Sequence, residues 1–407
     1  MLNRRQILRG AGGTALLLGG SYLAGWPLKA LAGETATLPF DNGERPLVQY
    51  PQKRPLLRLT TRPPQLETPF SVFDESVITP NDAFFVRYHL TMAPPVNLDP
   101  DTHRVEVKGL VNTPLSLSLA DLKTGFEPVE IVAVNQCSGN SRGLFEPRVA
   151  GGQLGNGAMG NARWKGVPLK AILDKAGVKE GAKQVTFDGL DGPAIDKTPD
   201  FVKALDIDQA RDGEVMVAYE MNGADLPVLN GYPVRLIVPG HYGTYWIKHL
   251  SQITVIDNVF DGFWMKPAYR IPANACACVP PGQKPAATVP ISRFNVRSFI
   301  TNLADGAKVK AGSDVVVKGI AFDGGYGITE VTLSTNGGRS WSGAKLGEDL
   351  GKYSFRPWQT AIRLKPGAHE LMVRAVNRIG QSQPMEPLWN PAGYMRNVVE
   401  TVRVTAA

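Results

Sequence analysis

Residues 129–143 read VEIVAVNQCSGNSRG and combine an apolar run with a polar loop. Its first six residues are mostly apolar, which predicts a short buried strand. Cys137 follows the strand directly and opens a polar loop that contains glycine. A nearby cation such as Arg142 favours the thiolate, the form of cysteine that attacks a substrate or ligates a metal. A lone cysteine is also often a small buried apolar residue. These residues alone leave both interpretations open.

The chain around this stretch, from about residue 81 to 275, mixes strand-like and helix-like segments. Residues 104–107 alternate with period 2 and predict a strand. Residues 168–176 predict a helix that has proline at its first position and ends at Gly177. Residues 234–238 predict another strand, which Pro239 and Gly240 end. Because regular β–α–β alternation is missing, the pattern is α+β.

The last third of the chain has a different pattern, which begins after a Pro- and Gly-containing linker at 279–285. Short strand-like runs recur here, and Asn336-Gly337 is a strong hairpin signal. Strands without helices over roughly 115 residues predict an immunoglobulin-like β-sandwich. We interpret it as a structural or interaction module. The predicted strands lie within 315–317, 330–334, 371–376 and 402–404.

The N-terminus has the features of an export signal. Arg4 and Arg5 precede a weakly apolar, glycine-containing stretch, and residues 30–32 (Ala-Leu-Ala) form a small-residue cleavage signal. We predict a twin-arginine signal over 1–32, a mature chain that starts near Gly33 and a location in the periplasm. No other segment is predicted to span a membrane. The Pro-rich residues 33–80 predict an extended arm.

Charge and cysteine content exclude several classes of protein. The 407 residues carry a net charge of +7, with 44 basic and 37 acidic side chains. Four of the basic residues lie in the predicted signal, so the remainder has 40 basic and 37 acidic residues, a net charge of +3. This balance argues against nucleic acid as a partner. Three cysteines exclude a disulfide framework. Cys276 and Cys278 are separated by one residue, and we expect two structural or free thiols there, although they could hold a soft metal.

A second segment, FFVRYH at residues 84–89, precedes the stretch around Cys137. If it is a strand, Phe85, Arg87 and His89 share one face. A converging arginine and histidine suit an oxyanion, whereas spacing alone favours a surface arginine and a core histidine. The other four histidines lack metal-ligand spacing, which disfavours a zinc or non-haem iron site.

Together these motifs resemble the sulfite oxidase family of molybdenum enzymes, from about residue 81 onward. Residues 85–89 (FVRYH) are similar to the family's F-V-R-N-H, and residues 137–142 (CSGNSR) to its C-A-G-N-R-R. The stretches that follow in family order are 187–191 (FDGLD), 218–223 (AYEMNG) with Leu226-Pro227, 231–235 (GYPVR), 238–240 (VPG), Lys248, and Trp264 five residues before Tyr269. The sequence departs from the family at Tyr88, at Ser141, and at Asn230, where animal members have a histidine.

The resemblance implies a molybdopterin domain over 81–280 and an immunoglobulin-like domain over 281–407 that often forms dimers. It implies one molybdenum–molybdopterin per chain, with Cys137 as the single protein ligand of the metal, and no haem on this chain. Arg87 and Arg142 would neutralise sulfite, Tyr269 would bind the reacting oxygen, and His89, Arg235 and Lys248 are candidates for the pterin phosphate. The implied cofactor-binding residues are Phe85, Val86, Arg87, Tyr88, His89, Asp191, Asn230, Arg235, Trp246, Ile247 and Lys248.

The activity that the resemblance implies is oxidation of sulfite to sulfate, with electrons passed singly to a c-type cytochrome that could be a tightly bound subunit. One alternative within the family is a sulfane dehydrogenase subunit of a thiosulfate-oxidising complex. An alternative from another class is a non-catalytic periplasmic binding protein in which the sandwich is the working part and Cys137 is structural.

Overall fold

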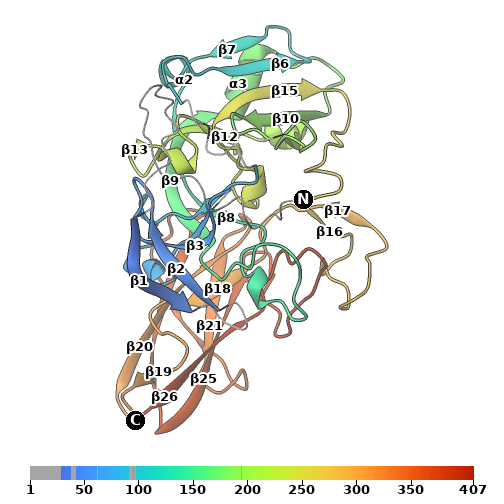
Figure 1. Cartoon of the computed structure of the whole chain (residues 1–407). Helices are drawn as coiled ribbons and strands as arrows, with labels where there is room; N and C mark the ends of the chain where they lie inside the picture. The colour runs from blue at the N-terminus through green and yellow to red at the C-terminus, as the bar shows by residue number, and fades with distance from the viewer. Residues whose placement is uncertain (1–28, 38–42, 62, 91–94, 96–97, 194) are drawn as a thin grey trace, which may run out of the picture.

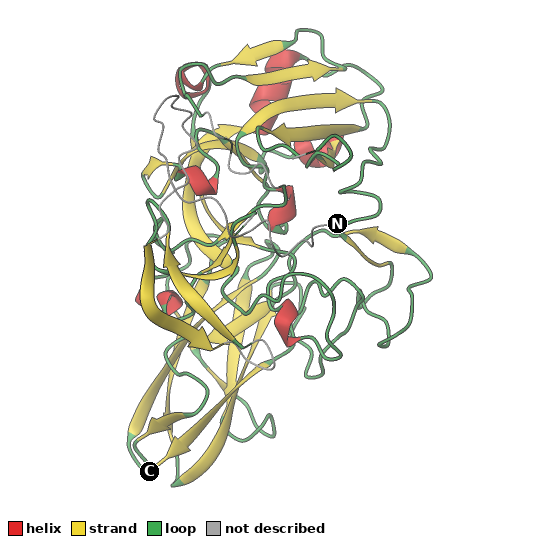
Figure 2. Ribbon diagram, viewed as in Figure 1, coloured by secondary structure: helices red, strands yellow, loops and turns green. Residues whose placement is uncertain are grey.

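A computed structural model of the chain describes residues 29–407, except for 38–42, 62, 91–94, 96–97 and 194. The described part is rich in strands, its helices are short, and it ends in a β-sandwich (Figure 2), which confirms the predicted fold class. The predicted signal at 1–32 falls largely outside the described residues. Its last four residues belong to the first strand, β1 (Lys29–Thr37).

The segment predicted as an extended arm instead forms most of a five-stranded sheet of order β1-β2-β3-β4-β5, which lies beside the middle of the molecule in Figure 1. This prediction was wrong because the many prolines of the segment, which suggested an extended arm, lie mostly in the connections between the strands. A one-turn helix, α1 (Val72–Glu75), follows the fourth strand. The other strands of the sheet are β2 (Glu44–Gln49), β3 (Leu56–Thr60), β4 (Gln65–Glu67) and β5 (Val86–Arg87).

A second sheet, with the order β11-β10-β15-β6-β7, forms the end of the molecule that is opposite the C-terminus (Figure 1). The predicted strand at 104–107 is confirmed as β6, which pairs in parallel with β15. Helix α2 (Leu119–Thr124) begins with a capping box in which Ser118 and Asp121 satisfy each other's backbone N–H groups. The strands are β6 (Val105–Gly109), β7 (Leu115–Leu117), β10 (Gln184–Gly189), β11 (Lys203–Asp206) and β15 (Leu250–Ile256).

A third sheet, with the order β13-β12-β9-β8, contains the two long strands that support the Cys137 loop. The predicted buried strand is confirmed as β8 (Val129–Gln136), which pairs with β9 (Met159–Pro168) along its whole length. The predicted helix is α3 (Leu169–Ala176), and Gly177 ends it in the left-handed conformation that glycine adopts without strain. The remaining strands are β12 (Met216–Met221), β13 (Ala224–Asp225) and β14 (Arg235–Ile237).

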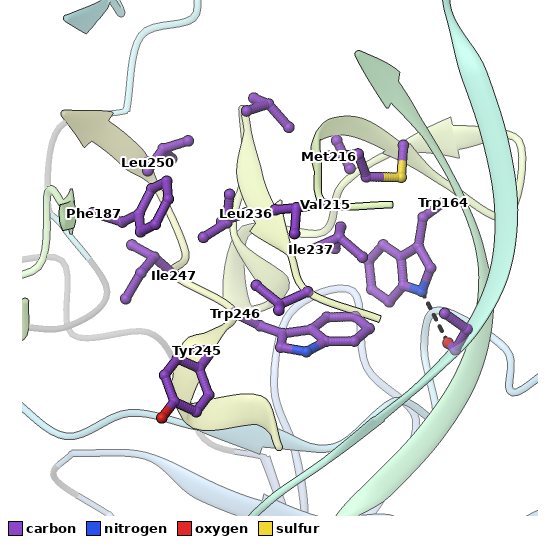
Figure 3. Close-up of a cluster of buried hydrophobic side chains, with 14 of the residues drawn as sticks. Trp164, Phe187, Val215, Met216, Leu236, Ile237, Tyr245, Trp246, Ile247 and Leu250 are labelled. Atoms are coloured by element: carbon purple, nitrogen blue, oxygen red, sulfur yellow. Dashed lines mark hydrogen bonds between the residues drawn. The ribbon is translucent and has the colours of Figure 1, made fainter. Parts of the chain in front are cut away.

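Aromatic and aliphatic side chains from the second and third sheets form one core (Figure 3). Trp164 on β9 is fully buried, and its Nε1 donates to the carbonyl oxygen of Ala133 at 3.0 Å. Its ring meets that of Trp246 edge-on at 5.6 Å. This core fixes the segment that contains Trp246, Ile247 and Lys248 against the sheets.

The C-terminal part is a sandwich of two sheets with their own core, as predicted. The sheet orders are β18-β20-β24-β23 and β19-β26-β25-β21-β22, and the turn at Asn336-Gly337 lies between β21 and β22. The strands are β18 (Arg297–Ile300), β19 (Ala307–Val309), β20 (Asp314–Phe322), β21 (Ile328–Ser334), β22 (Ser342–Gly343), β23 (Lys345–Leu346), β24 (Arg356–Arg363), β25 (Gly367–Asn377) and β26 (Glu400–Ala406).

A two-stranded ribbon joins the two parts of the chain. Strand β16 (Arg270–Pro272) pairs with β17 (Thr288–Pro290), so the Pro-rich linker lies in the loop of a hairpin. Within the described ranges, no helix is both long enough and apolar enough to cross a membrane.

Candidate active site

One cavity gathers most of the side chains singled out from the sequence. It encloses about 620 Å³ of space not filled by protein atoms, part of which is open to solvent. The predicted site residues that line it are Phe85, Arg87, Tyr88, His89, Cys137, Asp191, Asn230, Arg235, Trp246, Ile247, Lys248 and Tyr269.

Cys137 lies at the end of β8, where the chain leaves the sheet. Its N–H donates to the carbonyl oxygen of Ala158 at 2.9 Å, and its own carbonyl oxygen accepts from Asn140 at 3.0 Å. The side chain is half-buried and forms no disulfide. A thiol held by a paired strand on one side and a tight turn on the other is fixed in direction, as a metal ligand requires.

The segment at residues 84–89 is a strand only at Val86 and Arg87. Phe85, Arg87 and His89 face the cavity as the alternation predicts, but Tyr88 lines it as well. Val86 does not line the cavity and packs instead in a small core between the strands of the N-terminal sheet. The strand is too short for strict alternation to continue through Tyr88.

Several cations meet on one side of the cavity. Arg235 is buried, and its Nη1 donates to the carbonyl oxygen of Asn230 at 2.7 Å. Lys248 donates to the carbonyl oxygen of Arg87, and its Nζ lies 3.3 Å from the centre of the Tyr88 ring. Burial lowers the pKa of Arg235 to about 9, and burial together with Arg235 lowers that of Lys248 well below its usual value. Such crowded buried cations are costly unless an anion joins them.

Asp191 is the acidic residue among the predicted cofactor-binding residues, and it lines the same cavity as these cations. Burial raises its pKa to about 6, although the charge of Lys248 acts in the opposite direction. Asp191 cannot balance Arg87, Arg235 and Lys248 together, so the cavity has an excess of positive charge.

His89 is neutral at neutral pH, because burial and then Arg87 hold its pKa well below the usual value. Its Nε2 shares a hydrogen bond with the Tyr269 hydroxyl, and its ring stacks on Phe201 with centroids 4.0 Å apart. The pair of His89 and Tyr269 can therefore hold a proton between them without carrying a charge.

Four polar atoms on cavity-lining residues have no hydrogen-bond partner among the described residues: Asn135 Oδ1, Ser138 Oγ, Thr244 Oγ1 and Arg235 Nε. Buried polar groups are rarely left without partners. Together with the excess positive charge, these atoms fit a large, polar, anionic ligand better than an apolar one.

Comparisons with known proteins agree with this geometry. Residues 91–264 match the family model of the oxidoreductase molybdopterin binding domain, and residues 288–407 match that of the Mo-co oxidoreductase dimerisation domain. Human mitochondrial sulfite oxidase is 34% identical over 403 residues, which cover 94% of this chain and 72% of the relative. Chicken sulfite oxidase is 30% identical over 416 residues, with 93% and 88% covered.

The chain belongs to the sulfite oxidase family. It is a molybdopterin oxidoreductase of the kind that oxidises sulfite or a related sulfur compound at molybdenum. Among solved structures, the sulfane dehydrogenase SoxCD from Paracoccus pantotrophus superposes with a TM-score of 0.72 at 26% identity, covering 84% of this chain and 85% of that one.

The molybdopterin cofactor of this family fits the cavity. It is anionic and rich in hydrogen-bonding groups, as the buried cations and the partnerless polar atoms require. Arg235, Lys248 and the lining amide and hydroxyl groups would hold the pterin and its phosphate, and the Cys137 thiolate suits a soft metal.

Arg142 is placed differently from the prediction. It does not line the cavity; its Nε donates to the carbonyl oxygen of Ala392 at 3.1 Å, and its guanidinium lies 5.0 Å from the centre of the Tyr394 ring. Gly139 and Gly151 leave room for the guanidinium in this position, because a Cβ on either glycine would lie 2.7 Å or 2.9 Å, respectively, from guanidinium atoms of Arg142.

Asn230 lines the cavity, but both the oxygen and the nitrogen of its side-chain amide form hydrogen bonds within the protein. Its Oδ1 accepts from Lys53 Nζ at 2.5 Å, and its Nδ2 donates to the carbonyl oxygen of Phe85 at 3.1 Å. Lys53 comes from the N-terminal sheet region and is itself buried. This departure from the family pattern is therefore part of a lysine–asparagine pair.

Sequence reasoning missed six lining residues and two buried lysines, Lys53 and Lys203. Asn135 and Ser138 flank Cys137 in the quoted motif, and Thr244 precedes Trp246, so proximity to known motifs could have indicated them. Lys203 had no such signal: its Nζ donates to the carbonyl oxygen of Trp264 at 2.5 Å and lies 5.1 Å from the centre of the Tyr269 ring. The missed lining residues are Phe84, Asn135, Ser138, Phe201, Gly243 and Thr244.

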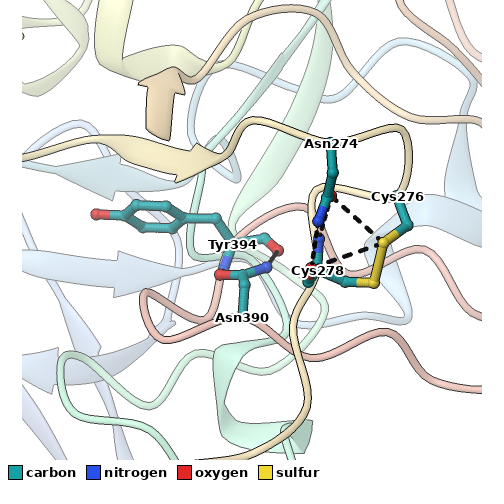
Figure 4. Close-up of a disulfide and its surroundings, with 5 residues drawn as sticks. All are labelled: Asn274, Cys276, Cys278, Asn390 and Tyr394. Atoms are coloured by element: carbon teal, nitrogen blue, oxygen red, sulfur yellow. Dashed lines mark hydrogen bonds between the residues drawn. A yellow bond between two sulfur atoms is a disulfide. The ribbon is translucent and has the colours of Figure 1, made fainter. Parts of the chain in front are cut away.

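Cys276 and Cys278 form a disulfide (Figure 4), so the expectation of two structural or free thiols was wrong. Ala277 between them adopts a left-handed conformation, with φ of 49°, which turns the chain enough to bring the two Cα atoms to 5.1 Å. Asn274 closes the turn by donating from Nδ2 to the carbonyl oxygen of Cys278 at 2.8 Å.

Proposed function

We propose that this protein oxidises sulfite to sulfate in the periplasm and passes the two electrons, one at a time, to a c-type cytochrome. The observation that carries the proposal is a single cavity that combines the Cys137 thiol, an excess of buried positive charge and the neutral pair of His89 and Tyr269. The twin-arginine pattern at Arg4 and Arg5 supports export of a folded, loaded protein.

In this proposal Arg87 binds the substrate. Sulfite is a small anion that carries up to two negative charges near neutral pH, and Arg87 lies on the cavity wall beside His89. Its guanidinium can donate two parallel hydrogen bonds to two oxygens of the anion. Phe201 and Trp264, which pack around His89, limit access of water and strengthen this attraction.

Tyr269 and His89 hold the reacting oxygen in place. The Tyr269 hydroxyl can donate a hydrogen bond to an oxygen of the substrate while its own oxygen accepts one from Nε2 of His89. Molybdenum on the pterin supplies the oxygen transfer and accepts two electrons when it is bound. The overall reaction converts sulfite and water to sulfate, two protons and two electrons, and the electrons reduce two ferric cytochromes.

The test of this proposal is a molybdenum count followed by steady-state kinetics. Protein matured through its own signal should contain about one molybdenum per chain and reduce cytochrome c with free sulfite. Cys137→Ser should lower the molybdenum content and abolish turnover. Cys276→Ser with Cys278→Ser is the matched control, because it changes two sulfurs outside the cavity and should keep both properties.

The same experiment separates the alternative within the family. The structural similarity to a sulfane dehydrogenase favours a second candidate, which is oxidation of a sulfane sulfur within a thiosulfate-oxidising complex. Molybdenum-loaded protein that does not oxidise free sulfite but turns over once partner proteins are added would select this alternative.

A separate experiment tests export. Replacement of Arg4 and Arg5 by lysine should leave the precursor in the cytoplasm, and unchanged export would contradict the twin-arginine route.

A further inference from the structure

Tyr394 belongs to the C-terminal part of the chain but lies against the active site. Its backbone is fixed by Asn390, whose Oδ1 accepts from the Tyr394 N–H at 3.1 Å and whose Nδ2 donates to the Tyr394 carbonyl oxygen at 2.8 Å (Figure 4). The next residue, Met395, donates its N–H to the carbonyl oxygen of Ser138 at 3.4 Å. The segment is therefore attached to the loop that begins at Cys137.

The ring of Tyr394 contacts Tyr269, which is assigned to the reaction, and Arg142, which lies outside the cavity. It stacks on the Tyr269 ring with centroids 5.5 Å apart and planes 4° from parallel. The Arg142 guanidinium carbon lies 5.0 Å from the centre of the same ring. Stacked aromatic pairs and cation–π contacts each stabilise an arrangement by about 0.5–2 kcal/mol.

The position of Arg142 depends on the absence of side chains around it. A Cβ on Gly393 would lie 2.8 Å from Arg142 Cγ, and one on Gly139 or Gly151 would meet the guanidinium at less than 3.0 Å. Gly393 itself has φ of 61°, a conformation that glycine adopts easily. Three glycines thus leave the space in which the arginine packs against the Tyr394 ring.

We propose that Tyr394 is a positioning residue that links Arg142 to Tyr269 and thereby fixes the Tyr269 hydroxyl at the substrate. This inference rests on the proposed function, because it takes Tyr269 as the group that contacts the oxyanion. Lys203 lies near the same Tyr269 ring, at 5.1 Å from its centre. Tyr269 is therefore supported by an aromatic ring as well as by the hydrogen bond to His89.

The experiment compares Tyr394→Leu with Tyr394→Phe in the molybdenum-loaded enzyme. The leucine variant removes the aromatic ring and should lower kcat/KM for sulfite roughly tenfold, whereas the phenylalanine variant keeps the ring and should stay within about twofold of the wild type. Calorimetric binding of sulfate, which does not react, gives a second readout, and the leucine variant should bind it several-fold more weakly. Tyr326→Leu, at an exposed tyrosine of the sandwich, is the matched control and should change neither value.

A double-mutant cycle with Arg142→Met tests the link itself. The effects of Arg142→Met and Tyr394→Leu on sulfate binding should be strongly non-additive, since each breaks the same series of contacts. Additive effects, or a phenylalanine variant as impaired as the leucine one, would overturn the proposal. A wild-type enzyme that holds molybdenum but does not oxidise sulfite would contradict the proposed function instead, and the sulfate measurements would still decide the role of Tyr394.

Discussion

At the scale of single residues, Arg87 gives the most direct prediction about the substrate. Arg87→Met keeps an unbranched, flexible side chain but removes the charge that faces the cavity. We expect KM for sulfite to rise at least tenfold with a smaller change in kcat, because a charge-assisted hydrogen bond contributes about 1.5–3 kcal/mol. Arg58→Met, on strand β3 outside the cavity, should leave KM unchanged. Steady-state kinetics decide the matter, and an unchanged KM for Arg87→Met would remove this residue from substrate binding.

Lys53 leads to a prediction about the stability of the folded protein. Its buried Nζ donates to Asn230 Oδ1, to the carbonyl oxygen of Asn81 at 2.6 Å and to that of Phe84 at 3.0 Å. Lys53→Met should lower the free energy of unfolding by roughly 1–3 kcal/mol, because it leaves buried acceptors without a donor. Lys318→Met removes a lysine from a partly exposed ion pair with Asp74 and should cost less than about 1 kcal/mol. Urea unfolding measures the free energy of unfolding of both variants, and equal losses of stability would contradict the role of Lys53.

Which residues could be predicted depends on whether a linear motif contains them. Cys137 and Arg87 were found because each lies in a motif whose spacing has a chemical reason. Arg142 was misplaced because it packs on Tyr394 and donates to the carbonyl oxygen of Ala392, 250 residues further along the chain, and local spacing cannot show such contacts. Lys53 and Lys203 were missed for the same reason: a buried lysine is recognisable only from the fold around it.

At the scale of secondary-structure elements, the end of strand β4 is tied to the loop that follows Cys137. Glu67 is buried and accepts the N–H groups of Gly155 at 3.0 Å and Gly157 at 2.6 Å. Burial raises the pKa of its carboxyl from 4.5 to about 7. The folded state therefore holds this proton more tightly than the unfolded state, and the resulting stability is present below pH 4.5 and is lost as the pH rises through 7.

The prediction concerns the difference between the wild type and Glu67→Gln. A pKa change from 4.5 to about 7 corresponds to roughly 3 kcal/mol, which the wild type should lose relative to the variant between pH 4.5 and pH 8. Urea unfolding of both proteins across this range provides the measurement. If the free energy of unfolding changed with pH in the same way in both proteins, Glu67 would have the same pKa in the folded and unfolded states.

Elements were predicted well where periodicity and end signals agree. The helix at 168–176 has an apolar face, a proline at its start and a glycine at its end, and it forms as α3 within one residue of the prediction. Strands β4 and β5 of the N-terminal sheet were missed because they have only three and two residues. Pairing with neighbouring strands, rather than the local sequence, makes such short segments into strands.

At the scale of the whole molecule, the two parts of the chain share a core across the predicted boundary at 280/281. The ring of Phe73 in α1 meets that of Phe355 from the sandwich edge-on at 5.9 Å, and Phe70 meets Phe299 of strand β18 at 5.4 Å. The main core cluster includes Phe299, Phe322 and Phe355 together with residues of the third sheet. A linker recognised from its composition therefore does not mark two independent folding units.

This shared core predicts a single unfolding transition for the whole chain. Phe73→Ala should lower the free energy of unfolding by roughly 3–5 kcal/mol, as expected for a buried phenylalanine, and calorimetry should still record one transition for the variant. Ile379→Ala, at an exposed apolar position of the sandwich, should change stability by less than about 0.5 kcal/mol. If the sandwich melted separately from the rest, the substitution would shift only one of two transitions. A single shifted transition instead means that the two parts unfold together, so the contact between Tyr394 and Tyr269 is lost in the same step as the rest of the fold.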